Sequence, residues 1–272
     1  MVALSVVLPA GCGGLGENQG APLIQVPLFV EGRPVGAAII DTGGGYEVML
    51  REDFGLEVVG RMVVLAFGGL ETVEITRGFR YSAGGVEAVA DSALVGLSAC
   101  ECNGLGVDFL RKAGIVFAVD YAEGTAAFLR TVPEEGMTLA FGDPPPGRIG
   151  LDSAFIEVSL AAGGRFRTVT GLLDTGATAT VMRRGLVGPA PIYSPDRMAV
   201  RVGNEHLGAV TINVGLFDQD GLPAIILGND IMRAWADRWY FSFAQAGGTV
   251  IVVPRSGESS DAEVPAIATR AR

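Results

Sequence analysis

Apolar residues along this chain fall into short runs separated by glycine-rich or polar turns. The runs at 23–30 and 155–160 are too short for typical helices and suit strands. Two pairs of such runs follow later, 116–121 with 125–129 and 239–243 with 249–253. The 40 glycines allow many tight turns between the runs. The pattern predicts an all-β protein whose helices are few and short.

The strand pattern occurs twice. VGAAIIDTGGGYEVML contains Asp41 and TVTGLLDTGATATVM contains Asp174, and each joins an apolar run to Asp-Thr-Gly and a turn of small residues. Leu94-Val95-Gly96 ends 55 residues after Asp41, and Ile226-Leu227-Gly228 ends 54 residues after Asp174. Matching landmarks in the same order predict a tandem duplication with two similar halves.

Each half also predicts one short helix. Asp108-Phe109-Leu110-Arg111 matches Asp230-Ile231-Met232-Arg233, and we expect Asp108 and Asp230 to cap helices that end near Ala113 and Trp235. Eleven residues separate Gly96 from Asp108, whereas one separates Gly228 from Asp230. This difference predicts a surface-loop insertion of about ten residues in the first half, a change that costs little.

These landmarks divide the chain into a leader (1–20), a first half (21–130), a linker (131–150), a second half (151–254) and a tail (255–272). The linker contains Pro144-Pro145-Pro146, which cannot lie inside a helix or a central strand. After Pro254 the sequence is rich in Ser, Glu, Asp and Ala, so we expect a disordered tail.

Charge excludes some partners. The formal net charge is −10, and Lys112 is the single lysine among 20 basic residues. Without a basic stretch to neutralise phosphates, we expect no nucleic-acid partner. No run of 18 apolar residues predicts a membrane-spanning helix.

The first twelve residues, MVALSVVLPAGC, are apolar and end in small residues before Cys12. They resemble the end of a bacterial lipoprotein signal, in which the cysteine is lipidated. A periplasmic or outer-membrane-anchored lipoprotein is one interpretation, and a plain apolar leader on a secreted protein is the other.

The other two cysteines, Cys100 and Cys102, are two residues apart, too far for an unstrained disulfide on an extended chain. The single histidine, His206, lies far along the chain, so no metal site is expected. We therefore expect two ordinary loop cysteines.

The two Asp-Thr-Gly turns carry the candidate chemistry. Facing each other across a pseudo-twofold axis, they would bring Asp41 and Asp174 together, and such a pair holds one proton over a wide pH range. One carboxylate can then activate a water molecule while its protonated partner polarises a peptide carbonyl. We expect Thr42 and Thr175 to cross-bond the turns, with Gly43 and Gly176 allowing close approach.

From about Leu23 to Val253 the chain resembles the pepsin and retropepsin superfamily of aspartic peptidases. Leu172-Leu173-Asp174-Thr175-Gly176-Ala177-Thr178 fits that pattern fully, whereas Gly44 and Gly45 replace the residues that usually support the first turn. The resemblance implies a bilobal fold made of two retropepsin-like halves and an endopeptidase without cofactor or metal. It also implies a monomer with one complete site for a peptide or protein substrate.

The resemblance further implies flaps that close over bound peptide. Glycine-containing hairpin tips are predicted at Ala66-Phe67-Gly68-Gly69 and at Val202-Gly203-Asn204-Glu205. Phe67, Gly68, Gly69, Gly203 and Asn204 are thus candidate substrate contacts, although both hairpins could be ordinary surface turns. Two wider alternatives remain: a non-catalytic peptide-binding or structural module, and a carbohydrate-active hydrolase that uses two carboxylates.

Overall fold

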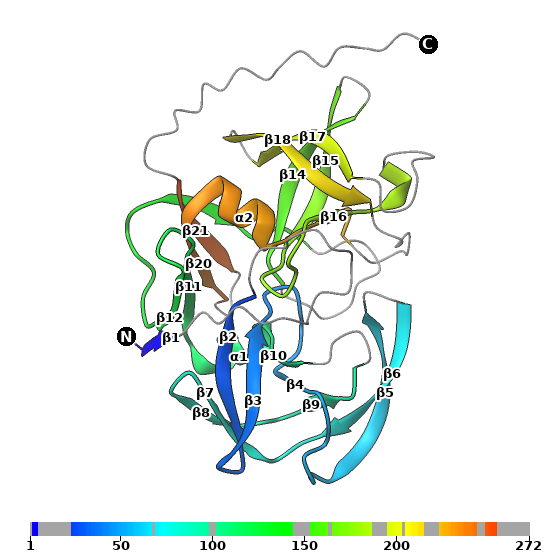
Figure 1. Ribbon diagram of the computed structural model, residues 1–272, viewed down its shortest axis with the longest axis vertical. Coiled ribbons are helices and arrows are strands. Elements are labelled where there is room, and N and C mark those ends of the chain that lie inside the picture. Colours follow the sequence, from blue (N-terminus) through cyan, green and yellow to red (C-terminus); the bar gives the residue numbers. More distant parts are fainter. Residues whose placement is uncertain are drawn as a thin grey trace.

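The computed structural model describes residues 2–4, 23–66, 69–97, 102–143, 153–162, 165–186, 195–202, 205–214, 223–243 and 248–254. These residues form two β lobes joined by a central sheet, and the two helices among them, α1 and α2, have seven residues each (Figure 1). The expected all-β, bilobal fold is confirmed. The predicted disordered tail lies outside the described residues.

The first lobe is a nine-stranded sheet in the order β5-β6-β9-β4-β10-β3-β2-β7-β8. Its strands alternate buried and exposed side chains, as β2 does with Val26, Leu28 and Val30 facing inward. The elements are β2 (Gln25–Val30), β3 (Arg33–Ile40), β4 (Val48–Leu50), β5 (Val58–Ala66), β6 (Gly69–Thr76), β7 (Arg80–Ala83), β8 (Val86–Val89), β9 (Ala93–Val95), β10 (Asn103–Leu105) and α1 (Val107–Ala113).

The second lobe is a closed barrel in the order β14-β15-β19-β16-β18-β17, because β17 also pairs with β14. The elements are β14 (Phe155–Ala162), β15 (Arg165–Leu173), β16 (Val181–Met182), the 3-10 turn η1 (Arg184–Leu186), β17 (Pro195–Val202), β18 (Glu205–Val214), β19 (Ile225–Leu227) and α2 (Asn229–Trp235).

A six-stranded sheet unites the halves in the order β1-β12-β11-β20-β21-β13. The two strand pairs predicted at the end of each half meet here, since β11 of the first half pairs antiparallel with β20 of the second. The strands are β1 (Val2–Leu4), β11 (Val116–Asp120), β12 (Thr125–Leu129), β13 (Met137–Ala140), β20 (Ala236–Ser242) and β21 (Thr249–Pro254). The predicted linker thus contributes a strand, β13, beside β21.

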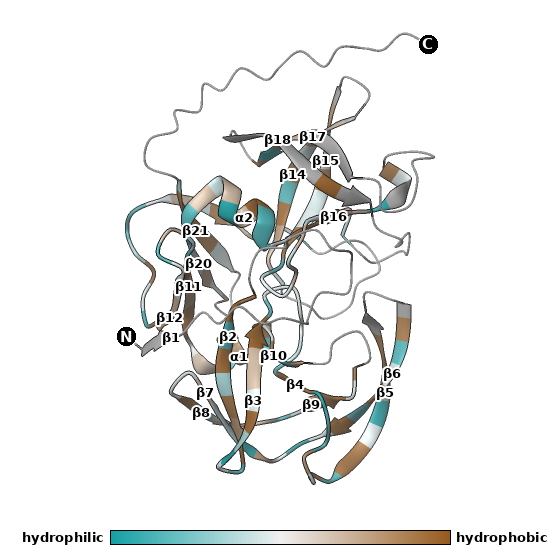
Figure 2. Ribbon diagram, viewed as in Figure 1, coloured by the Kyte–Doolittle hydropathy of each residue, from teal (hydrophilic) through white to brown (hydrophobic). Residues whose placement is uncertain are grey.

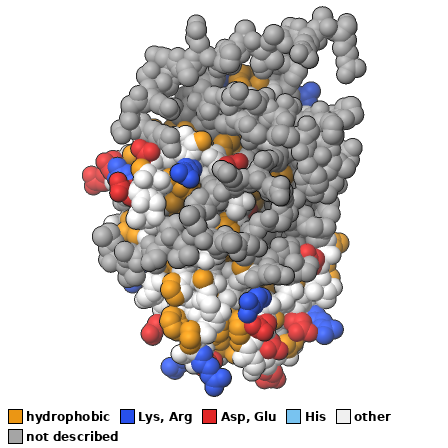
Figure 3. Space-filling view, in the orientation of Figure 1, with side chains coloured by type: hydrophobic (Ala, Val, Ile, Leu, Met, Phe, Trp, Pro, Cys, Tyr) orange, Lys and Arg blue, Asp and Glu red, His pale blue; other side chains and the backbone are white. Residues whose placement is uncertain are grey.

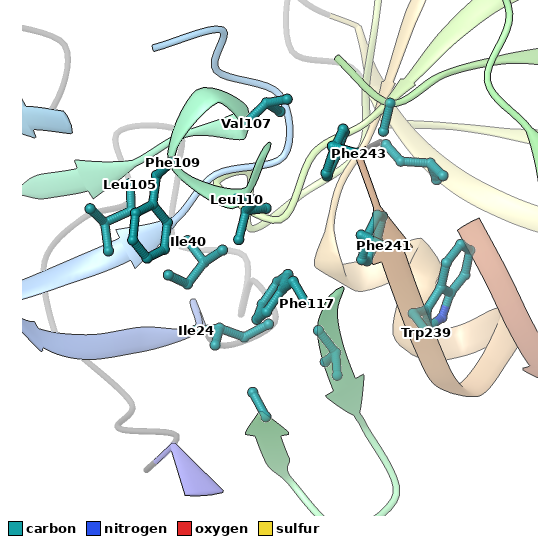
Figure 4. Close-up of a cluster of buried hydrophobic side chains, with 14 of the residues drawn as sticks. Ile24, Ile40, Leu105, Val107, Phe109, Leu110, Phe117, Trp239, Phe241 and Phe243 are labelled. Atoms are coloured by element: carbon teal, nitrogen blue, oxygen red, sulfur yellow. The ribbon is translucent and has the colours of Figure 1, made fainter. Parts of the chain in front are cut away.

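One continuous cluster of buried apolar side chains runs from the first lobe through the central sheet into the second lobe. Figure 4 shows Phe117 and Phe241 between Ile24 and Ile40 on one side and Trp239 on the other. The Phe117 and Phe241 rings stack across the paired strands β11 and β20, 6.1 Å between centroids, and the rings of Trp239 and Phe241, both on β20, stack at the same distance. This shared core fixes the two lobes relative to each other.

The two halves correspond differently from the sequence prediction. β19 pairs in parallel with β15 and leads through Gly228 into α2, and in the first lobe it is β10 that pairs in parallel with β3 and leads through Gly106 into α1. The counterpart of Ile226-Leu227-Gly228 is therefore Gly104-Leu105-Gly106. The prediction of Leu94-Val95-Gly96 was wrong because β9 presents a similar apolar pair at a similar distance from Asp41.

The extra length of the first half therefore does not lie just before α1. One residue separates Gly106 from Asp108, just as one separates Gly228 from Asp230. In the first lobe β7 pairs with β2 and β9 pairs in parallel with β4, just as in the second lobe β17 pairs with β14 and β18 pairs in parallel with β16. Within the described residues, the β5–β6 hairpin between β4 and β7 therefore has no counterpart in the second lobe. The predicted loop insertion is replaced by this added hairpin, which extends the sheet beside β9.

The helices occur where they were predicted, but their caps differ. Gly106 and Gly228 hold the N-cap positions without a side-chain cap bond, and Asp108 and Asp230 lie in the first turn. Asp108 pairs instead with Arg111 at 2.6 Å, whereas Asp230 accepts from the hydroxyl of Thr180 at 2.7 Å. Both acids still stand where the helix dipole favours negative charge.

Candidate active site

The two candidate aspartates occupy equivalent turns. Asp41 directly follows β3 and Asp174 directly follows β15, and each strand ends in a fully buried residue, Ile40 or Leu173. The backbone N–H of Asp41 donates to the carbonyl of Leu105 at 2.9 Å, and that of Asp174 donates to the carbonyl of Leu227 at 3.0 Å. Each lobe thus fixes one aspartate at the inner end of its sheet.

The threonines of the two turns are hydrogen-bonded to each other. Thr42 Oγ1 accepts from the backbone N–H of Thr175 at 3.1 Å and donates to the Leu173 carbonyl at 2.8 Å. In return, Thr175 Oγ1 accepts from the N–H of Thr42 at 3.2 Å and donates to the Ile40 carbonyl at 2.6 Å. Both side chains are fully buried, so the predicted cross-bonds lock the two turns in register.

The glycines after the threonines make room for the opposite carboxyl group. A Cβ on Gly43 would lie 2.5 Å from Cγ of Asp174, and a Cβ on Gly176 would lie 2.9 Å from Cγ of Asp41. Neither glycine has a positive φ, so close approach and not backbone strain is the physical reason for glycine here. Each glycine N–H also donates to the aspartate of its own turn, Gly43 to Asp41 Oδ1 at 2.9 Å and Gly176 to Asp174 Oδ1 at 2.8 Å.

The two carboxyl groups lie next to each other, since a Cβ on Gly176 would be 2.9 Å from Oδ1 of Asp41 and 3.1 Å from Oδ1 of Asp174. Burial raises the pKa of Asp174 well above its ordinary value, and the charge of Asp41 raises this pKa further. Backbone N–H groups of Gly176 and Ala177 oppose the shift only in part. Two buried carboxyl groups this close share one proton over a wide pH range.

Tyr46 is a site residue that the sequence interpretation missed. Its hydroxyl donates to Oδ2 of Asp41 at 2.7 Å. The available signal was the spacing DTGGGY, in which two extra glycines precede an aromatic residue with a hydrogen-bonding hydroxyl.

A second set of missed residues supports the other turn. Asn229 Nδ2 donates to the carbonyls of Thr175 at 2.8 Å and Ala177 at 2.9 Å. The hydroxyl of Tyr121, directly after β11, donates to Asn229 Oδ1 at 2.5 Å. Asn229 is fully buried at the start of α2, so helix and central sheet together hold the Asp174 turn.

Both predicted hairpins form. In the first lobe Ala66 pairs with Gly69 at the end of β5 and β6, and in the second Val202 pairs with Glu205 at the end of β17 and β18. Phe67, Gly68, Gly203 and Asn204 lie outside the described residues, and Gly69 begins β6. The β5–β6 hairpin contains hydrophobic residues (Figure 2). Large apolar side chains there are exposed, including Val63 (59 % exposed) and Leu70 (73 % exposed).

The expectation of two ordinary loop cysteines is wrong for Cys102, which is disulfide-bonded. Its partner is one of the other two cysteines of the chain, Cys12 and Cys100, and both lie outside the described residues. The sulfur chemistry was missed because a pairing over a short or a very long separation leaves no regular spacing in the sequence.

No three described His, Cys, Asp or Glu residues gather where a metal ion could bind. In the same part of the chain, no helix is long and apolar enough to cross a membrane. On the face shown in Figure 3, charged side chains of both signs stand among apolar ones over the first lobe.

Neither a protein-family model nor a curated protein matches the sequence. The structure is similar to the crystal structure of the aspartic proteinase from Irpex lacteus, with a TM-score of 0.54 and 12 % sequence identity. The match covers 85 % of this chain and 94 % of that chain. The chain therefore has the fold of an aspartic proteinase, and at this identity the likeness concerns the fold alone.

Proposed function

We propose that this chain is an aspartic endopeptidase in which Asp41 and Asp174 hydrolyse peptide bonds by general acid–base catalysis. The observation that carries the proposal is the close approach of these two carboxyl groups at the junction of the lobes, where a Cβ on Gly43 would lie 2.5 Å from Cγ of Asp174 and one on Gly176 2.9 Å from Cγ of Asp41. The threonine cross-bonds support it, because they hold the pair in one geometry before substrate binds.

We assign Asp41 the role of base, because two hydrogen-bond donors face its carboxylate, and Asp174 the role of acid. Asp41 accepts a proton from a water molecule as the water oxygen attacks the peptide carbonyl carbon, and Asp174 donates its proton to the carbonyl oxygen. Asp41 then passes its new proton to the leaving nitrogen while Asp174 recovers a proton from a hydroxyl of the tetrahedral intermediate. The C–N bond breaks, an acid and an amine leave, and both aspartates regain their initial states.

The two lobes are proposed to be fused retropepsin-like halves. Each has a strand ending in Asp-Thr-Gly, a parallel partner strand, a glycine and a seven-residue helix in the same order. We further propose that the two predicted hairpins, β5–β6 and β17–β18, close over bound peptide as flaps. Phe67, Gly68, Gly69, Gly203 and Asn204 remain the candidate flap contacts.

Both aspartates belong to one chain, so we propose a monomer with one complete site and no cofactor. We further propose that the protein works outside the cytoplasm, since disulfides such as that of Cys102 persist in oxidising compartments. Lipidation of Cys12 stays a prediction. Processing there would remove Val2–Leu4, which pair as β1 with β12, so the mass of the native N-terminal peptide tests it.

The alternative is a non-catalytic peptide-binding or structural module. Gly44 and Gly45 favour it, because they replace the residues that usually support the first turn. A peptide library incubated with the purified chain between pH 3 and 8, with products read by mass spectrometry, separates the two proposals. Cleavage by the wild type and none by Asp41→Asn or Asp174→Asn supports the peptidase. Peptide binding that is equal in all three proteins, without cleavage in any, overturns it.

A further inference from the structure

Both oxygens of the Asp41 carboxylate accept a hydrogen bond from the first lobe. The backbone N–H of Gly43 donates to Oδ1 at 2.9 Å, and the hydroxyl of Tyr46 donates to Oδ2 at 2.7 Å. Two donors to one carboxylate stabilise its ionised form, because each bond is stronger to a charged acceptor.

Two glycines keep the space for the Tyr46 ring. A Cβ on Gly44 would lie 2.2 Å from Cε1 of Tyr46, and a Cβ on Gly104 would lie 2.4 Å from its hydroxyl oxygen. Neither glycine has a positive φ, so room for the ring is what requires glycine. At Gly44, where the chain departs from the family pattern, the missing side chain leaves room for the Tyr46 ring, whose hydroxyl donates to Asp41.

The Tyr46 side chain is held in place from its backbone and from its flank. The N–H of Asp108, in the first turn of α1, donates to the Tyr46 carbonyl at 3.2 Å, and the N–H of Val107 donates to the Gly44 carbonyl at 2.9 Å. The ring packs against the buried cluster that includes Ile39 and Met49. The hydroxyl is therefore aimed at Asp41 by a rigid surround.

Among the described residues, no side chain of the second turn donates to Asp174 in this way. Five residues after Asp174, the place of Tyr46 is taken by Ala179, and the Asp174 carboxyl group accepts from the backbone of Gly176 and Ala177. The carboxyl groups of Asp41 and Asp174 therefore have different hydrogen-bond donors, although the backbones of the two halves correspond.

We propose that Tyr46 is a positioning residue whose hydroxyl keeps Asp41 ionised and correctly oriented, so that Asp41 is the base and Asp174 the acid. This inference rests on the proposed peptidase function. The Tyr46 hydroxyl remains protonated and can donate, because burial and the nearby charge of Asp41 raise the pKa of Tyr46 well above its ordinary value.

The charged groups around Tyr46 fall into two sets. Asp41 and Asp174 face its hydroxyl. The neighbouring Glu47 is bound to Tyr81, to the backbone of Asp91 and to Lys112 of α1. The dyad is therefore the set whose titration depends directly on the hydroxyl.

Tyr46→Phe is the direct test, because phenylalanine keeps the ring and removes only the hydroxyl. A hydrogen bond to a charged group corresponds to about one pH unit, so the acid limb of the kcat/KM profile should move up by about one unit. At the acidic end kcat should fall about tenfold while KM changes little. Tyr81→Phe is the matched control, since it removes a hydroxyl that donates to the buried Glu47 at 2.9 Å and should leave the limb in place.

The ¹³C carboxyl titration of the dyad in wild type and Tyr46→Phe provides a readout that needs no cleavage. An upward shift in the pH at which the ionised dyad takes up a proton, absent in Tyr81→Phe, supports the proposal even if the wild type cleaves nothing and the peptidase function fails. An unchanged acid limb and an unchanged carboxyl titration in a folded Tyr46→Phe protein overturn it. A fall in melting temperature without either shift also overturns it, because it indicates a purely structural residue.

Discussion

Thr42 and Thr175 exchange hydrogen bonds across the junction of the two lobes, each hydroxyl accepting from the other's backbone N–H at 3.1 or 3.2 Å. Each hydroxyl then donates to the strand that carries the opposite aspartate. The four bonds join the two turns, so the distance between Asp41 and Asp174 depends on both lobes.

Thr42→Val should therefore impair both stability and catalysis. Valine preserves the shape but leaves the N–H of Thr175 and the carbonyl of Leu173 buried without this partner, at about 1–3 kcal/mol for each group. We expect a lower free energy of unfolding in denaturant titration and a kcat reduced more than KM is changed. Thr42→Ser retains the hydroxyl and should keep most of the activity, and equal behaviour of the two variants would contradict this role.

Asp41→Asn and Asp174→Asn should each reduce kcat on a cleaved peptide by several orders of magnitude. One remaining carboxyl group cannot act as base and acid in the same step, so the double variant should be scarcely worse than either single one. Asp108→Asn is the control, because its carboxylate pairs with Arg111 on a half-exposed surface. Near-normal turnover in either single dyad variant would show that the dyad is not the catalytic pair.

Stability should depend on pH through Asp174. Its pKa is raised in the folded state, so the folded protein holds a proton that the unfolded chain releases near pH 3.9. The folded state then binds more protons, and the contribution of Asp174 to stability falls as pH rises through this window towards the folded pKa. Asp174→Asn removes this loss, so its melting temperature relative to wild type should increase from pH 3 to pH 7. A constant difference would contradict the raised pKa.

Much of this arrangement could be predicted from the sequence because it depends on local pattern. Asp-Thr-Gly after an apolar run places Asp41 and Asp174 at strand ends, and the threonine cross-bonds follow once the turns face each other. The short helices at Asp108 and Asp230 also occur where the repeat indicated.

The features that were missed depend on contacts between segments distant in the sequence. β10 and not β9 pairs with β3, and β9 pairs with β4 instead. The sequence does not reveal this strand order, because both segments are short and could each pair with β3. The role of Tyr46 depends on Gly104, 58 residues away, whose lack of a side chain admits the hydroxyl. The flap contacts at Phe67, Gly68, Gly203 and Asn204, which lie outside the described residues, stay predictions.

Activity per molecule should not fall on dilution, since one chain contributes both aspartates to the site. Initial rates measured from micromolar to nanomolar protein should be proportional to concentration, whereas a site assembled from two chains loses activity as the dimer dissociates. Sedimentation at the same concentrations provides the control. A rate that falls faster than concentration, together with a dimer-to-monomer transition, would contradict a complete site in one chain.

The glycines after the threonines offer the most direct steric test of the dyad. A methyl group on Gly43 would lie 2.5 Å from Cγ of Asp174, and one on Gly176 would lie 2.9 Å from Cγ of Asp41, so Gly43→Ala should displace the opposite carboxyl group further. A misplacement of reacting groups by about 1 Å can cost about a hundredfold in rate. We expect kcat to fall by roughly this factor in Gly176→Ala and by more in Gly43→Ala.

The matched control for both variants is Gly60→Ala in β5. A Cβ there would meet nothing within 4 Å, and the backbone has no positive φ. This variant should keep wild-type kcat, which separates a local clash at the dyad from any general effect of replacing a strand or turn glycine. If Gly43→Ala is folded by circular dichroism and cleaves peptide as fast as Gly60→Ala, the two carboxyl groups do not approach each other as closely as the structure places them, and the shared proton loses its basis.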